Sequence, residues 1–248
     1  MPDLKWGDKG KIMKRVILKL SGEIFQGEQE FGIDTLQLKR LAEEITGVHN
    51  KGIELGIVVG GGNFIRGSNN PLKGVDRVTS DYMGMLGTLM NALALQNMIE
   101  NSGITTRLQS GIEVKSLAEP FIRRRALRHI EKGRVLIFAC GTGSPYFTTD
   151  TASVLRAIEL KADTILKGTK VNGVYNKDPL KYPHAKKYDK ISYEEFIERN
   201  LQVMDLTAVT LAKSEEIPIV VFNITKEGNL GSLIDGTRIG TLIGKEKE

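Results

Sequence analysis

Three consecutive glycines, Gly60, Gly61 and Gly62, follow a short apolar run and precede Asn63 and Arg66. Glycine contributes no side-chain packing and loses more backbone entropy on folding than other residues. A chain tolerates three in a row where the backbone turns tightly or a ligand approaches it closely. Free N–H groups at a helix N-terminus, with an arginine beside them, form an anion site. The cluster therefore predicts either a phosphate cradle or a plain tight turn between a strand and a helix.

Two further segments carry groups suited to phosphate. Lys19 is near the end of the apolar run VILKL (16–20), which Ser21-Gly22 follows, and its charge there could neutralise a phosphoryl group or simply face solvent. The segment GTGSPYFTTD, residues 141–150, offers glycines, hydroxyls and a helix N-terminus, with Thr148 or Thr149 as the N-cap. Phosphoryl transfer needs positioning and positive charge more than covalent chemistry, so these segments favour that reaction.

Four carboxylates could serve ribose hydroxyls or Mg²⁺, namely Asp81, Asp150, Asp178 and Asp205. Each is also an ordinary choice for a helix cap or a loop, and Asp81 and Asp205 fall at expected helix starts, where acids are favoured. We take Lys19, Arg66, Asp150 and Asp205 as the candidate catalytic residues.

Several kinds of site are excluded by the motifs that the sequence lacks. It has no G-x-x-x-x-G-K-[ST] and no G-x-G-x-x-G after its first apolar run, so neither a Walker-type nucleotide site nor a dinucleotide fingerprint is expected. No Cys/His cluster has metal-ligand spacing, so we expect no protein-bound metal centre. The histidines His49, His129 and His184 are interpreted as structural or surface residues, and Cys140 as a buried thiol.

The hydrophobic patterning predicts strands that alternate with helices. Strands are expected near 16–20, 53–59, 104–108, 135–140, 164–166, 217–223 and 241–243. Helices are expected over 34–50, 81–102, 150–160, 193–200, 205–215 and 229–234, and in the last part of the segment 113–133. Ser80 is expected to be the N-cap of the helix over 81–102, and a hairpin is possible at Asn172-Gly173. The helix over 81–102 is apolar nearly all round and should be buried, with its methionines as core filler. This alternation predicts an α/β fold with a mainly parallel sheet covered by helices on both faces, and ligands at the carboxyl ends of its strands.

The bulk properties limit the remaining possibilities. The 248 residues suit one large or two small domains, and no linker divides them, so we expect a polar extension over 1–13 and a single domain over 14–248. A net charge of +5 favours anionic ligands, but the lysines are dispersed, which makes nucleic acid an unlikely partner. One cysteine indicates a reducing cytoplasm, and the sequence contains no run of 18 apolar residues, so we expect no membrane-spanning segment.

Six segments together resemble the bacterial-type UMP kinases of the amino acid kinase family. They are KLSGE (19–23), VVGGGNFIRG (58–67), DYMGMLGTLMNALALQ (81–96), GTGSPYFTTD (141–150), GTKVNGVYNKDP (168–179) and VMDLTA (203–208). The resemblance runs from about Arg15 to Gly244 and implies a three-layer α/β/α sandwich. It also implies transfer of the ATP γ-phosphate to UMP, with Mg²⁺ carried mainly by the nucleotide phosphates.

The same resemblance assigns binding residues by position. For ATP these are Lys19, Leu20, Ser21, Gly22, Gly62, Arg66, Thr169, Tyr175 and Asp178. For UMP these are Gly61, Asp81, Thr142, Gly143, Ser144, Pro145, Tyr146, Phe147, Thr148 and Thr149. The chain departs from the family at Ser144, where members often have Asn.

The resemblance further implies a homohexamer that is inhibited by UTP and activated by GTP. The loop associated with GTP consists of Gly27, Glu28, Gln29, Glu30, Phe31 and Gly32, and Glu30 stands where many members carry glycine.

The chemistry of the acceptor agrees with this reading. A phosphate monoester with a second pKa near ~6 is largely dianionic at neutral pH and needs no general base to attack. Two alternatives remain open from the sequence. One is a kinase of the same fold that acts on a carboxylate or carbamate, and the other is a nucleotide-responsive binding protein without turnover.

Overall fold

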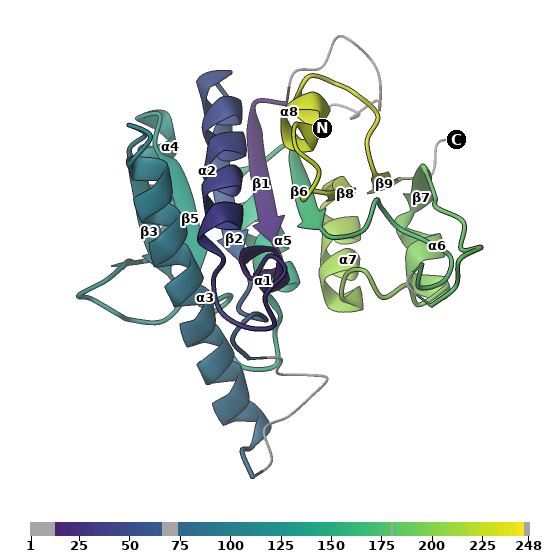
Figure 1. Ribbon diagram of the computed structural model, residues 1–248, viewed down its shortest axis with the longest axis horizontal. Coiled ribbons are helices and arrows are strands. Elements are labelled where there is room, and N and C mark those ends of the chain that lie inside the picture. Colours follow the sequence, from purple (N-terminus) through teal and green to yellow (C-terminus); the bar gives the residue numbers. More distant parts are fainter. Residues whose placement is uncertain (1–12, 66–73, 180, 246–248) are drawn as a thin grey trace.

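A computed structural model describes residues 13–65, 74–179 and 181–245. Its described strands form one sheet of nine in the order β4-β3-β5-β2-β1-β6-β8-β9-β7 (Figure 1). All neighbours pair in parallel except β8 and β9, which are antiparallel. The strands are β1 (Arg15–Leu20), β2 (Glu54–Val59), β3 (Thr106–Ser110), β4 (Glu119–Pro120), β5 (Val135–Ala139), β6 (Thr164–Thr169), β7 (Lys190–Ser192), β8 (Ile219–Asn223) and β9 (Thr241–Gly244).

The helices cover both faces of this sheet (Figure 1). They are α1 (Gly22–Phe25), α2 (Thr35–Asn50), α3 (Arg77–Glu100), α4 (Arg123–Glu131), α5 (Thr149–Leu160), α6 (Tyr193–Glu198), α7 (Leu206–Ser214) and α8 (Asn229–Ile234). Side chains alternate along β1: Leu18 packs into the core with α2, α3 and α8, whereas Ile17 packs into the core with α4 to α7. The predicted α/β/α sandwich with a mainly parallel sheet is confirmed.

Three helix starts follow the capping signals of the sequence. The carboxylate of Asp34 accepts hydrogen bonds from Leu36 N and Gln37 N, and Thr148 Oγ1 accepts them from Asp150 N and Thr151 N. Asp205 caps α7 by accepting from Ala208 N. Side-chain oxygens at these positions satisfy N–H groups that have no partner within the helix, which fixes where each helix begins.

The predicted start of α3 is wrong by one turn. Asp76, not Ser80, is the N-cap, and its side chain accepts from Thr79 N at 3.0 Å. Asp81 therefore lies in the second turn of the helix rather than at its start. An Asp is as good a cap as a Ser, so local preference alone could not choose between the two positions.

The expectation that α3 is buried all round is also wrong. Four side chains at intervals of one helical turn are well exposed: Val78 at 38 %, Tyr82 at 43 %, Leu86 at 50 % and Met90 at 46 %. Met90 is therefore not core filler, although Met85 is. Figure 1 shows that the N-terminal half of α3 projects beyond the sheet.

Short elements and long-range pairings differ most from the expectation. Helix α1 and the short strands β4 and β7 were not predicted, and no tight hairpin forms at Asn172-Gly173. Instead Tyr175 pairs antiparallel with Lys187 across a longer loop. The predicted extension over 1–13 lies almost wholly outside the described residues, so that boundary stays a prediction. Within the described part of the chain, no helix combines the length and apolar character needed to cross a bilayer.

Candidate active site

Two buried lysines share one carboxylate at the carboxyl edge of the sheet. Lys19 and Lys167 are register partners on the parallel strands β1 and β6, so their side chains leave the same face side by side. Lys19 Nζ lies 2.7 Å from Asp150 Oδ1, and Lys167 Nζ lies 2.5 Å from Asp150 Oδ2. Asp150 is in the first turn of α5. Two ammonium groups on one carboxylate leave one positive charge in excess, which suits an anionic ligand.

The pKa values in this cluster reflect burial and charge in opposition. Burial alone would raise the pKa of Asp150, but the charges of Lys167 and Lys19 outweigh it and hold the pKa well below its usual range. Burial lowers the pKa of Lys167 to about 8; Asp150 opposes this shift and the charge of Lys19 adds to it. The ammonium group of Lys167 therefore loses its proton at a pH close to neutral, and pKa values shifted in this way are common in active sites.

Asp205 ties the cluster to a second helix. Its carboxylate accepts hydrogen bonds from the hydroxyls of Thr148 and Thr151, while its backbone N donates to Asp150 Oδ2 at 3.4 Å. The N-termini of α5 and α7 thus meet beside Lys19 and Lys167. Both helix dipoles present their positive ends at this place, which adds to the attraction for phosphate.

The glycines allow the strand ends to pack backbone against backbone. A Cβ on Gly22 would lie 2.3 Å from Gly62 N, and a Cβ on Gly61 would lie 2.5 Å from Gly84 O of α3. At Gly62, by contrast, a Cβ would meet no atom within 4 Å in the described part of the chain. Gly22 and Gly61 are therefore required by packing within the protein, whereas Gly62 faces open space where a ligand can approach the backbone.

Two buried asparagines fix the glycine cluster. The side-chain amides of Asn63 and Asn91 donate to each other's Oδ1 at 2.9 and 2.7 Å, and Asn91 Nδ2 also donates to Gly60 O. Asn63 Nδ2 donates to Gly32 O, and Phe31 packs edge-on against Phe64 with ring centroids 5.5 Å apart. The loop over 27–32, which we expected to respond to GTP, is thus attached to the glycine cluster.

The segment 141–149 lies against the N-terminal half of α3. Tyr146 N donates to Asp81 Oδ2 at 2.8 Å, and Ser144 N donates to Thr142 Oγ1 at 3.2 Å. A Cβ on Gly143 would lie 2.3 Å from Gly111 O, so only glycine fits there. Ser144, Tyr146, Phe147 and Thr148 are exposed. The structure therefore brings Asp81 together with the loop that the sequence assigned to the same nucleotide.

The remaining candidates lie at the ends of β1 and β6 or on the segments that follow them. Leu20 is fully buried and its carbonyl accepts from Gly60 N, so it can offer a ligand little, whereas Ser21 lies at the turn into α1. Thr169 ends β6 and is buried; Tyr175 and Asp178 lie on the loop that follows. Arg66 lies outside the described residues, and its expected place beside phosphate stays a prediction.

The described carboxylates at this edge of the sheet do not form a coordination site for Mg²⁺. Both oxygens of Asp150 are engaged by lysines, and those of Asp205 by hydroxyls and Ala208 N. Throughout the described ranges, no three side chains of His, Cys, Asp or Glu are grouped so that they could hold a metal ion. Mg²⁺ requires oxygen ligands in octahedral geometry, and in nucleotide-binding enzymes some of these ligands are phosphate oxygens of the substrate. The protein residues described here do not supply such a set.

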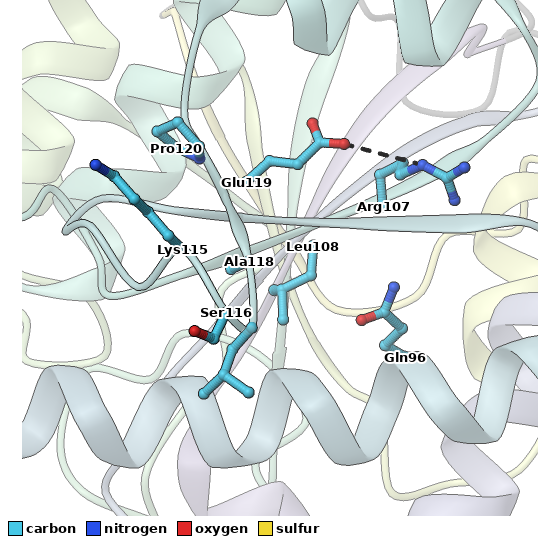
Figure 2. A pocket seen from close by; sticks show the side chains of 9 residues that line it. Gln96, Arg107, Leu108, Lys115, Ser116, Ala118, Glu119 and Pro120 are labelled. Carbon is cyan, nitrogen blue, oxygen red and sulfur yellow. Dashed lines mark ion pairs between the residues drawn. The ribbon is translucent and has the colours of Figure 1, made fainter.

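A hollow of about 440 Å³ lies elsewhere, between α3, β3 and the segment over 115–120 (Figure 2). Figure 2 shows the Glu119–Arg107 ion pair at its wall, with Gln96 and Lys115 on either side. Strands β5 and β2 separate β3 from β1. The hollow is therefore not part of the lysine cluster, whose position follows from side-chain chemistry and not from the size of a cavity.

Comparison with known proteins agrees with this geometry. Residues 14–223 match the model of the amino acid kinase family. The chain belongs to the amino acid kinase family. It is similar to a UMP kinase from Bacillus anthracis at 38 % identity and a TM-score of 0.91, with 96 % of this chain and 98 % of that chain covered.

Two further solved structures extend this likeness. A UMP kinase from Ureaplasma parvum shares 35 % identity at a TM-score of 0.88, with 94 % of this chain and 99 % of that chain covered. A uridylate kinase from Archaeoglobus fulgidus shares 26 % identity at a TM-score of 0.71, with 92 % and 99 % covered. The family predicted from the sequence is confirmed.

Sequence reasoning missed Lys167 as a member of the site. Lys167 directly follows the strand expected near 164–166, but it belongs to none of the segments that the sequence assigned to a ligand. What makes Lys167 important is its register with Lys19, which depends on β1 and β6 being neighbours. A lysine at the ends of two apolar strands was the only available signal.

Proposed function

We propose that this chain transfers the γ-phosphoryl group of ATP to UMP and releases ADP and UDP. The observation that carries the proposal is the pair of ammonium groups of Lys19 and Lys167 on Asp150. The pair lies at the edge where the glycine cluster and the loop over 142–149 come together. The similarity to UMP kinases over nearly the whole chain supports the choice of acceptor.

The reaction brings two anions together, and the cluster answers that difficulty. An oxygen of the UMP phosphate dianion attacks the γ-phosphorus, and the bond from this phosphorus to the β–γ bridging oxygen breaks. That oxygen keeps the electron pair and leaves with ADP. Lys19 and Lys167 stabilise the charge on the transferred group, and because the acceptor is already ionised, no residue must remove a proton.

The described residues divide between the two nucleotides. We assign Ser21, Gly22, Gly62, Thr169, Tyr175 and Asp178 to the ATP side, together with Arg66 from outside the described residues, and the backbone of Leu20. We assign Gly61, Asp81 and the loop of Thr142–Thr149 to UMP. Gly62 supports this division because its backbone faces open space. Asp150 and Asp205 act by holding the lysines and the two helix N-termini in place. Since the residues form no cage for Mg²⁺, we propose that the ion comes with the phosphates of ATP.

The exposed stripe on α3 supports assembly with further copies of the chain. Val78, Tyr82, Leu86 and Met90 lie along one face of the helix, and a contiguous exposed apolar face is uncommon on a protein that acts alone. We propose that this face meets a second copy within the homohexamer that the resemblance implies. Inhibition by UTP and activation by GTP are proposed on the same basis. Asn63 Nδ2 donates to Gly32 O, and Gly32 N donates to Asn63 O, so the loop over 27–32 is linked directly to the glycine cluster.

A coupled assay of ADP release tests the activity. The acceptors are UMP, CMP, aspartate, acetylglutamate and carbamate, each supplied with ATP and Mg²⁺, and then repeated with GTP and with UTP. We expect ADP release with UMP. Release with an amino acid or carbamate but not with UMP would instead favour another activity of the same fold. Nucleotide binding without any release would favour a binding protein. A place in the cytoplasm and a single domain over 14–248 remain proposals drawn from the sequence.

A further inference from the structure

Helix α3 begins one turn earlier than the sequence predicted, and this additional turn contains Arg77. It lies at the first position of the helix, and Asp81 lies one turn later on the same face. Arg77 Nε is 3.0 Å from both carboxylate oxygens of Asp81. The guanidinium carbon of Arg77 is 5.5 Å from the centre of the Tyr146 ring, within the range of a cation–π contact.

Tyr146 needs such support because its backbone is strained. Its φ is +70°, in the left-handed region that bulky side chains rarely adopt. Tyr146 makes two contacts with α3, a hydrogen bond from its N to Asp81 Oδ2 at 2.8 Å and the packing of its ring against Arg77. A strained backbone conformation persists only where contacts with the surrounding structure enforce it, and such conformations are concentrated at functional sites.

The arrangement leaves Asp81 oriented but not saturated. An ionised carboxylate offers about four lone-pair directions, and the N–H groups of Arg77 and Tyr146 occupy up to three of them. At least one direction remains for a hydroxyl of a ligand. The Asp81 side chain is 15 % exposed, which leaves it accessible from solvent.

We infer that Arg77 is a positioning residue for the acceptor nucleotide, which fixes the Asp81 carboxylate and the Tyr146 turn in the arrangement that receives the ribose. This inference rests on the proposed function, since it assigns Asp81 to UMP. An ordinary surface pair between Arg and Asp four residues apart contributes little to stability or binding. Arg77 differs because its guanidinium contacts both a carboxylate and an aromatic ring of a separate loop.

The test compares Arg77→Gln and Arg77→Lys with Arg199→Gln. Arg199 is a matched control because its Nε also pairs with a carboxylate four residues away, Glu195 Oε1 at 2.7 Å, on α6 and its C-cap. We expect Arg77→Gln to raise the KM for UMP by about tenfold, while kcat and the KM for ATP stay within about twofold of wild type. The KM for UMP of Arg77→Lys should lie between those of wild type and Arg77→Gln, because lysine keeps the charge but not the planar donor group. Arg199→Gln should match wild type throughout.

Hydrogen exchange of the Tyr146 amide gives a readout that needs no substrate. This amide donates to Asp81, so we expect faster exchange in Arg77→Gln than in wild type or Arg199→Gln. A KM for UMP within twofold of wild type would overturn the inference, whether or not exchange becomes faster. Failure of the wild-type protein to phosphorylate UMP would overturn the proposed function itself. The exchange measurement would then still show whether Arg77 holds the turn.

Discussion

Lys19 and Lys167 occupy matching positions on neighbouring parallel strands, and the carboxylate of Asp150 lies between their ammonium groups. Two like charges placed so close in a buried setting would repel each other without that carboxylate. The pairing therefore concentrates positive charge at one point of the sheet edge and holds it there before any ligand binds. Such preorganisation is the main way in which proteins stabilise a phosphoryl group in transfer.

Removing the charge of Lys167 should abolish most of the turnover. We expect Lys167→Met to lower kcat by at least about 10²-fold, because one preorganised charge contributes on that scale to a transition state. Steady-state kinetics with UMP and ATP measure the effect. Lys213→Met is the matched control, since Lys213 pairs with Glu194 on the exposed surface at 2.8 Å. Equal loss of activity in both variants, or in neither, would contradict the assignment of Lys167.

The rate should depend on the protonation of Lys167. Its pKa is lowered to about 8, and only the ammonium form can neutralise phosphate. We therefore expect kcat/KM for ATP, which reports the free enzyme, to fall as the pH rises through about 8. The effect on stability has the opposite sign: the unfolded chain keeps this proton up to the ordinary lysine pKa of 10.5, so the contribution of Lys167 to the free energy of unfolding rises as the pH increases from about 8 to 10.5. A kcat/KM that stays constant to about pH 9.5 would show that the charge of Lys167 is not used.

Two glycines in the same contact should respond differently to alanine. Gly22→Ala places a Cβ 2.3 Å from Gly62 N and should destabilise the fold by about 1–3 kcal/mol. Gly62→Ala meets no atom of the described residues within 4 Å, so its stability should equal or slightly exceed that of wild type while its KM for ATP rises. Urea unfolding and steady-state kinetics separate the two effects. An unchanged KM for ATP in Gly62→Ala would remove Gly62 from the donor site.

A charge on the exposed face of α3 should disrupt assembly. Leu86 is at the middle of the stripe and is 50 % exposed, so we expect Leu86→Glu to shift the protein to smaller species in light scattering. Leu36→Glu on α2 is the control, because Leu36 is 58 % exposed but outside the stripe. If Leu86→Glu leaves the molar mass of the wild-type assembly unchanged, the stripe is not the contact between copies.

The sequence was informative where local chemistry decides the structure. Asp34, Thr148 and Asp205 were expected at helix starts and cap them. Lys19 lies near the end of β1 and the glycine cluster directly follows β2, as the sequence predicted. The start of α3 was not predictable because Asp76 and Ser80 are both good caps, one turn apart. That one turn decides whether Arg77 faces Asp81.

What remained hidden depends on contacts far apart in the chain. The role of Lys167 follows from the pairing of β1 with β6, and that of Tyr146 from a loop folding onto α3. Neither pairing leaves a local pattern, because strand order and loop docking are set by the packing of the whole domain. The exposed stripe of α3 was misread for a similar reason: an exposed apolar face looks the same in sequence as one directed at the core.

The most direct test follows the phosphoryl group itself. Wild type and Lys167→Met are mixed with UMP and with ATP radiolabelled on its γ-phosphate, and the products are separated during a single turnover. The account predicts that the label moves into UDP in the wild-type reaction and that this transfer is at least about 10²-fold slower in the variant. Label that remains in ATP, or that moves to UDP equally fast in both proteins, would contradict it.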